Sequence, residues 1–236
     1  MPTLRLIGPG RAGQSLTVAL ARAGWDLAEP HIGRGQDVTH AAQGVDALLI
    51  AVPDGAIAPV AQKVEPNPDC VVLHMAGSLT LEALAPHPRR ASIHPLCTLA
   101  EPNIGAEHLG KGGVWFAIAG DPIAKEMADA LHGIAIQVDD DLRAVYHAAA
   151  VIASNHLVAL LGQVERVARQ ANVPLSAYFD LVRQTVDNVE RLGPVEALTG
   201  PVKRKDWDTI ERHIAALPED ERAAYEAMAR EALKCS

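Results

Sequence analysis

The stretch that decides the fold is Leu4-Arg5-Leu6-Ile7-Gly8-Pro9-Gly10-Arg11-Ala12-Gly13, a short apolar run that enters a glycine-rich turn. A helical pattern over residues 14–23 follows at once. This order of strand, G-x-G-x-x-G and helix is the context in which the motif is typical of dinucleotide binding. Gly8 permits the tight turn, Gly10 lets a pyrophosphate approach the backbone, and Gly13 lets helix and strand pack closely. The free N–H groups at the helix start favour phosphate, so we predict cofactor contacts at Gly8, Pro9, Gly10, Arg11, Ala12 and Gly13. A turn that serves only the fold is the alternative.

Short apolar runs alternate with helical patterns over the first 139 residues. The expected strands are 4–7, 25–33, 47–52, 71–74, 91–94, 114–118 and 134–137, and the expected helices are 14–23, 56–64, 79–84 and 123–131. Such alternation is typical of βαβ units. We therefore predict an α/β fold with a Rossmann-like, mostly parallel sheet that carries helices on both faces.

The pattern becomes helical after residue 139. Asp139-Asp140-Asp141 resembles an acidic N-terminal cap, and helical patterns follow over 142–170, 175–192, 207–217 and 219–233. We predict two domains, a Rossmann-like dinucleotide-binding domain over 1–139 and an all-helical domain for substrate binding and dimerisation over 140–236. Ala148-Ala149-Ala150 would permit the close approach of a homodimer interface; a monomer that buries this helix internally is the alternative.

The composition narrows the function class. The 236 residues carry a formal net charge of −8 with no basic run, which argues against a nucleic-acid partner. Three cysteines without C-x-x-C spacing argue against a disulfide framework or a metal site and fit a reducing cytoplasm. The glycine turn occupies the place of a signal-peptide h-region. The longest apolar run, around 147–161, contains uncharged polar residues, so we expect no membrane span and a cytoplasmic location.

The end of the second expected strand bears on the cofactor type. NAD-binding domains place an acid there to hold the ribose hydroxyls, whereas this chain has His31-Ile32-Gly33-Arg34-Gly35. The guanidinium of Arg34 suits a 2′-phosphate, which predicts NADP, with NADPH preferred over NADH. One alternative is that Arg34 is a solvent-exposed loop arginine without a role. The other is that the strand ends earlier in the sequence than expected, so that Glu29 holds the ribose hydroxyls. Val52 and Pro53, at the next strand end, should border the cofactor, and Asp54 should cap the following helix.

Four polar residues are candidates for the chemistry. His94 ends an expected strand, and His147 lies in the long helix, with Ser154 and Asn155 two turns later. At 3.6 residues per turn these three helix positions lie close to one face. His147 or His94 would supply a proton, and Ser154 and Asn155 would orient a carbonyl or imine. The alternative is a packed interface whose polar groups are simply hydrogen-bonded.

Several segments together with the glycine turn carry a resemblance: Ala51-Val52-Pro53-Asp54, Ser92-Ile93-His94-Pro95-Leu96, Tyr146-His147-Ala148-Ala149-Ala150, Ala153-Ser154-Asn155-His156 and Leu198-Thr199-Gly200-Pro201. The chain resembles a bacterial family of presumed oxidoreductases that join an N-terminal Rossmann-like NADP-binding domain to a C-terminal helical domain of unknown function. It is more distantly similar to ketopantoate reductase, pyrroline-5-carboxylate reductase and 6-phosphogluconate dehydrogenase, several of which dimerise through the helical domain.

The resemblance implies hydride transfer between NADP(H) and a small carbonyl or imine substrate held between the two domains. One departure stands out, because hydroxyacid and ketopantoate enzymes use a helix lysine with an asparagine one turn later. No lysine lies between Lys125 and Lys203 here, and the helix offers His147 with Asn155 two turns on. A non-catalytic NADP(H)-binding sensor or partner-binding module is therefore the alternative, and a reductase that also uses a deazaflavin is a third possibility. A mild preference for anionic substrates would follow only if the turn with Lys203 and Arg204 reaches the site.

Overall fold

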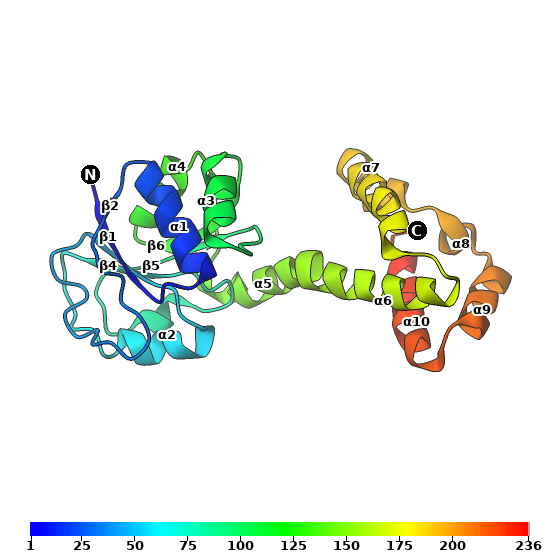
Figure 1. Ribbon diagram of the computed structural model, residues 1–236, viewed down its shortest axis with the longest axis horizontal. Coiled ribbons are helices and arrows are strands. Elements are labelled where there is room, and N and C mark those ends of the chain that lie inside the picture. Colours follow the sequence, from blue (N-terminus) through cyan, green and yellow to red (C-terminus); the bar gives the residue numbers. More distant parts are fainter. Residues whose placement is uncertain (236) are drawn as a thin grey trace. The chain divides into compact units, whose positions relative to one another are not determined.

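The computed structural model describes residues 1–235, and these divide by contact density into two compact units. The first unit is Met1–Val151, and the second runs from Ile152 to the end of the described chain. Each unit is described by itself below (Figure 1).

A seven-stranded sheet forms the centre of the first unit, as described over residues 1–151. Its spatial order is β2-β1-β3-β4-β5-β6-β7, and every neighbouring pair is parallel except β5 and β6. The strands are β1 (Thr3–Ile7), β2 (Asp26–Leu27), β3 (Ala47–Ile50), β4 (Val71–His74), β5 (Arg90–Pro95), β6 (Trp115–Gly120) and β7 (Ile134–Gln137). The prediction of a mostly parallel Rossmann-like sheet is confirmed. The chain leaves β1 for β2 on one side and returns to β3 on the other, which creates the switch point where such folds bind ligands.

Helices cover both faces of this sheet (Figure 1). On one face lie α1 (Arg11–Arg22), α3 (Pro102–Gly110) and α4 (Ile123–Ala130), and on the other lie α2 (Asp54–Ala61) and the 3-10 helix η1 (Leu81–Leu84). Successive strand residues point to opposite faces. Accordingly Leu49 packs in the core beneath α1 while its neighbours Leu48 and Ile50 pack beneath α2. This explains why β3 is apolar at every position.

Two expectations about the first unit are wrong. The strand expected over 25–33 is only two residues long, with one isolated bridge between Ile7 and Ile32, because the intervening segment contains Pro30, which has no N–H to donate to a ladder. Helix α3 was not predicted from its glycine-containing sequence. Its start is capped by Glu101, whose side chain accepts the backbone N–H groups of residues 103 and 104.

The acidic triplet before the long helix does not cap that helix. No side-chain cap bond forms at Asp139, and the carboxylate of Asp140 instead accepts the N–H of Leu81 at 3.0 Å. Asp140 therefore caps η1, more than fifty residues earlier in the chain. The next helix, α5 (Arg143–Val151), belongs to the same compact unit as the sheet.

The second unit is helical, as predicted. It contains the π-helical turn η3 (Ile152–His156), α6 (Leu157–Gln170), the 3-10 helix η4 (Leu175–Tyr178), α7 (Phe179–Ala197), the unpredicted short helix α8 (Gly200–Arg204), α9 (Trp207–Ala216) and α10 (Glu219–Leu233). The guanidinium of Arg166 on α6 forms an ion pair with the buried carboxylate of Glu221 on α10. Among residues 152–235, only Ala168, Ile210 and Glu221 are buried.

The helical run Asp140–Gln170 is long and apolar enough to cross a membrane by length and composition, although none of its most apolar window is buried. The expectation that no apolar run reaches this length is therefore wrong. Alanine, valine, isoleucine and leucine fill most of its apolar window, so the few polar residues Ser154, Asn155 and His156 do not bring the mean hydropathy down far enough. Composition alone does not identify a membrane span, since core helices of other proteins meet the same criterion.

Candidate functional site at the carboxyl edge of the sheet

The three glycines of the first turn differ in their surroundings as the dinucleotide motif requires. Gly8 has a φ of +87°, and a Cβ there would meet Ala51 O at 2.6 Å and Val52 Cγ1 at 2.8 Å. A Cβ at Gly13 would lie 2.8 Å from the Cβ of Ala51. A Cβ at Gly10 would meet nothing within 4 Å. Two glycines are thus required by the fold, and the third faces open space.

The start of α1 offers unpaired N–H donors to that space. Gly10 is the N-cap, no side chain caps the helix, and no acidic residue stands in the first turn. Among residues 1–235, the backbone N–H groups of Arg11, Ala12 and Gly13 meet no acceptor, while Pro9 O accepts the side-chain amide of Gln14 at 2.7 Å. Open space before free N–H groups at a helix start fits a pyrophosphate.

The neighbouring strand ends complete this part of the site. Val52 lies against Gly8, and Pro53 is the N-cap of α2. Asp54 is the first residue of α2 and makes no side-chain cap bond, so the expectation that it caps the helix is wrong. Arg34 is exposed and, within the described chain, forms no hydrogen bond or ion pair. The carboxylate of Glu29 accepts the N–H of His31 at 3.1 Å. Of these two candidates, Arg34 is the one with an unengaged side chain.

A cluster of polar side chains lies between β5 and α5, near the same carboxyl edge of the parallel strands. The ring nitrogen Nδ1 of His94 lies 2.8 Å from the hydroxyl of Tyr146. The His94 ring also packs edge-on against His147, with ring centroids 5.5 Å apart. Two of the predicted residues, His94 and His147, are therefore brought together across 53 positions of sequence by the packing of α5 on the sheet.

Arg143 is the member of this cluster that sequence reasoning missed. It is fully buried, and its guanidinium donates to Ser92 Oγ and to the carbonyl of Ala76, both at 2.8 Å. No carboxylate pairs with it in the described structure, and its Nε has no partner. A sequence clue was available, since Arg143 precedes His147 by one helical turn, but an arginine near a helix start is usually exposed.

Two buried histidines at this place, His74 and His94, are held neutral. Burial lowers the pKa of His74 to about 4, with a further contribution from the charge of Arg143. Burial also lowers the pKa of His94 to about 4, assisted by His147 and Arg143. The Nδ1 atom of His147 is buried against Gly77 without a hydrogen-bond partner. Neither His74 nor His94 carries a positive charge at neutral pH, which limits both as acids.

Ser154 and Asn155 lie in the π-helical turn that opens the second unit. A π-helical turn closes i→i+5 hydrogen bonds, so the spacing of 3.6 residues per turn that placed these residues on the face of His147 does not hold through it. Their part in orienting a substrate stays a prediction. Such turns occur frequently at functional sites.

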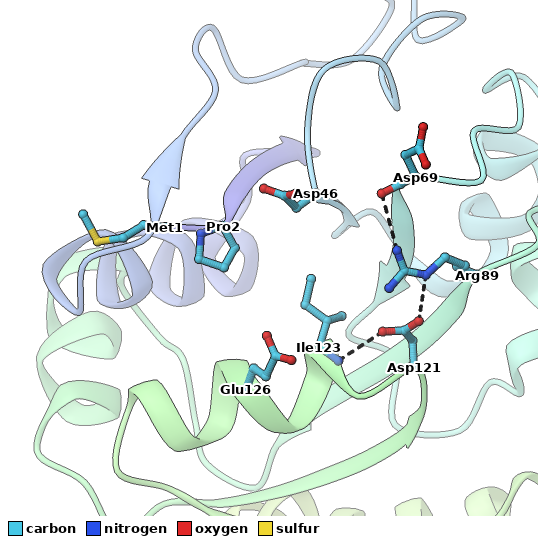
Figure 2. A pocket seen from close by; sticks show the side chains of 8 residues that line it. All are labelled: Met1, Pro2, Asp46, Asp69, Arg89, Asp121, Ile123 and Glu126. Carbon is cyan, nitrogen blue, oxygen red and sulfur yellow. Dashed lines mark hydrogen bonds and ion pairs between the residues drawn. The ribbon is translucent and has the colours of Figure 1, made fainter.

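A separate pocket of about 430 Å³ lies at the opposite, amino edge of the sheet (Figure 2). Arg89 donates to the carboxylate of Asp121 at 3.0 Å, and Asp121 also accepts the N–H of Ile123 at 3.2 Å. The other lining residues are Met1, Pro2, Asp46, Asp69 and Glu126. Its carboxylates outnumber its one arginine, so this pocket repels phosphate and is not the dinucleotide site.

A second pocket, of about 580 Å³, belongs to the helical unit and is lined mainly by apolar side chains of α6, α9 and α10. Two of its polar side chains are in contact with each other: His213 Nδ1 lies 2.8 Å from the hydroxyl of Tyr225. Within residues 1–235, no three His, Cys, Asp or Glu side chains are grouped to hold a metal ion. The three cysteines are free thiols.

Comparison with known proteins gives one matching family model and several similar structures. Residues 115–232 match the family described as Domain of unknown function (DUF2520). No curated protein sequence matches the chain.

Three solved structures are similar over nearly the whole chain. A presumed NADP oxidoreductase from Bacteroides fragilis has a TM-score of 0.79 at 20% identity, over 99% of this chain and 98% of that one. A protein from Thermotoga maritima has a TM-score of 0.73 at 24% identity, over 98% of both chains. The reductive aminase from Aspergillus terreus, solved with NADPH and ethyl levulinate, has a TM-score of 0.72 at 13% identity, over 99% of this chain and 94% of that one. At these identities the likeness establishes the shared fold.

Proposed function

The chain belongs to the DUF2520 family, and we propose that it is an NADP-dependent oxidoreductase that transfers hydride between NADP(H) and a small carbonyl or imine substrate. The observation that carries this proposal is the first turn, in which Gly8 and Gly13 are required by the fold while Gly10 leaves open space before unpaired N–H groups. The similar folds of a reductive aminase and of a presumed NADP oxidoreductase support it.

The residues have separate tasks in this proposal. The N–H groups that follow Gly10 bind the pyrophosphate, and Arg34 binds the 2′-phosphate through a charge-assisted hydrogen bond. Val52 and Pro53 border the ribose. The bound dinucleotide supplies or accepts the hydride. The polar cluster of His94, Tyr146 and His147 lies near the carboxyl edge, where ligands of open α/β sheets bind, and it would handle the proton.

Titration with NADPH and with NADH, followed by calorimetry, tests the cofactor assignment. We expect wild type to bind NADPH more tightly than NADH by roughly tenfold or more, since one charge-assisted bond is worth about 1.5–3 kcal/mol. Arg34→Ala should remove that difference without changing the affinity for NADH. Arg22→Ala is the matched control, because Arg22 is an exposed arginine in the last turn of α1.

The same titrations separate the alternatives. Binding of NADPH without its oxidation by any small ketoacid, ketone or imine would favour the non-catalytic sensor. Binding of neither dinucleotide would mean that the glycine turn serves only the fold. Affinity for a deazaflavin, which absorbs in the visible range, would favour the third possibility.

The helical unit supports the further proposal of a homodimer. Helix α7 buries none of its residues and exposes large apolar side chains, among them Leu181, which is 61% exposed. The helix also carries Asp180, Arg183, Asp187, Glu190, Arg191 and Glu196, which a lipid bilayer would exclude. A second copy of the chain offers the same mixed surface, and most soluble oligomers are symmetric pairs of this kind.

Light scattering of purified protein tests the dimer. We expect wild type to have twice the chain mass and Leu181→Glu to shift it toward the monomer. Ile104→Glu is the control, because Ile104 is similarly exposed, at 67%, but lies on α3 of the first unit. A monomeric wild type, or flotation of the protein with phospholipid vesicles, would contradict the proposal.

A further inference from the structure

Two contacts join α5 to β5 in a matched register. Arg143 donates to Ser92 Oγ, and three residues later Tyr146 meets His94, with donor–acceptor distances of 2.8 Å in both cases. Residues three apart on a helix lie on one face, and residues two apart on a strand point to one side. The two contacts together therefore fix both the rotation of α5 and the position of the Tyr146 hydroxyl above the end of β5.

Tyr146 is better suited to give up a proton than either histidine. His94 is neutral, and its Nδ1 is already engaged by the tyrosine hydroxyl. His147 turns its Nδ1 into the protein, against Gly77. The phenol of Tyr146 is half-buried, and burial raises its pKa, so it is protonated at neutral pH. With His94 as the Nδ1–H tautomer, that nitrogen donates to the phenol oxygen and leaves the phenolic hydrogen free.

Arg143 gives this hydroxyl a charged neighbour. Its guanidinium is fully buried and bonded only to neutral acceptors, so its charge acts on the groups around it with little screening. The titratable groups that face the cluster come from several elements: His74 from β4, His94 from β5, Asp54 from the start of α2, Asp140 from the 3-10 turn before α5, and Tyr146 and His147 from α5 itself. Asp140 attracts Arg143, but its carboxylate is committed to the N–H of Leu81.

We propose that Tyr146 is the proton donor of this site, and that His94 and Arg143 are positioning residues that stabilise the tyrosinate left behind. This inference rests on the proposed reductase activity. The carbon of the C=O or C=N group receives a hydride, with its electron pair, from the reduced nicotinamide. The oxygen or nitrogen of that group takes the phenolic proton, and the O–H electrons stay on the tyrosine oxygen. A proton from water then restores the phenol.

The test measures NADPH oxidation at 340 nm with pyruvate, cyclohexanone and 1-pyrroline as probe substrates, together with the Kd for NADPH. Tyr146→Phe should lower kcat by roughly 10²–10⁴-fold, the usual contribution of a general acid, and leave the Kd unchanged. Tyr225→Phe is the matched control, because it removes a tyrosine hydroxyl bonded to a histidine at the same 2.8 Å outside this cluster. Its kcat should equal that of wild type.

The pH profile separates positioning from a merely structural role. A tyrosine donor must be protonated, so kcat falls at alkaline pH. Arg143→Met should move the alkaline fall in kcat to higher pH, because the cation that favours tyrosinate is gone. Arg143→Lys should move it part of the way back toward the wild-type position. If Tyr146→Phe fails to fold, His94→Gln gives a second test. This variant should lower kcat, because it removes the histidine that positions the Tyr146 hydroxyl.

The outcomes distinguish this inference from the function on which it rests. Wild-type turnover that Tyr146→Phe leaves intact would overturn the inference and keep the reductase. An alkaline fall in kcat that does not move in Arg143→Met would overturn the role of Arg143. Wild type that reduces none of the probes, with or without NADPH binding, would overturn the donor assignment together with the proposed activity.

Discussion

Replacing Gly10 with alanine isolates the dinucleotide site from the stability of the fold. Gly10 has φ −80° and ψ 179°, a conformation that alanine adopts without strain. Its Cβ would meet nothing within 4 Å. The cost to stability is limited to the weaker N-cap preference of alanine, about 1 kcal/mol.

The same methyl group should weaken NADPH binding far more. It would stand where the phosphates must approach the backbone, so at least one hydrogen bond from an N–H to a charged oxygen is lost. Such a bond is worth about 1.5–3 kcal/mol, which corresponds to a Kd roughly 10- to 150-fold higher. Calorimetric titration with NADPH measures this change directly.

Gly13→Ala is the matched variant with the opposite expectation. Its Cβ would lie 2.8 Å from the Cβ of Ala51 and 2.9 Å from both Gly8 O and Leu6 Cδ1, all in the packed junction of α1 and the sheet. Overpacking of this kind costs about 1–3 kcal/mol, so urea unfolding should show a lower midpoint. The reasoning is refuted if Gly10→Ala is folded and binds NADPH as wild type does, or if Gly13→Ala is as stable as wild type.

Two further predictions concern the polar cluster. The pKa values of His74 and His94 are lowered from 6.5 to about 4 in the folded protein. Between these two pH values, the histidines are therefore protonated in the unfolded chain and neutral in the folded one. The free energy of unfolding should therefore fall as the pH drops through this range, by at most about 3 kcal/mol for each histidine. Urea unfolding of His74→Gln should show a flatter dependence, and an unchanged slope would argue against a buried neutral His74. Gly77→Ala should lower the melting temperature, because its Cβ would collide with the His147 ring. Gly55→Ala in α2 is the control and should be neutral or stabilising, because its Cβ would meet open space. Equal melting temperatures of the two variants would contradict this prediction.

Most elements of the fold could be predicted from the sequence because each depends on residues that are neighbours in the chain. The apolar run 71–74 has the length and composition of a buried strand, and β4 has these bounds and is buried at every position. The glycine spacing of the first turn likewise reflects backbone conformation and close packing, which are properties of neighbouring residues. These features do not depend on what the rest of the chain does.

The helix and the helix cap that the sequence did not predict depend on contacts with distant residues. Helix α3 packs closely on α1, and a Cβ at Gly105 would collide with Ser15, so the glycine that weakens its sequence pattern is what allows the packing. The carboxylate of Asp140 accepts the N–H of Leu81, which lies close in space but far away in the sequence. No spacing in the sequence predicts this hydrogen bond.

The sequence by itself determined most of the strands and helices, the glycine turn and the polar residues available for chemistry, because periodicity and turn geometry are set over a few residues. Only the tertiary structure decided which of these polar groups meet. The contact of Tyr146 with His94, and the burial of Arg143 against Ser92 without a carboxylate partner, depend on how α5 packs on β5. The partners in these two contacts are more than fifty residues apart, so no local pattern of sequence could bring them together.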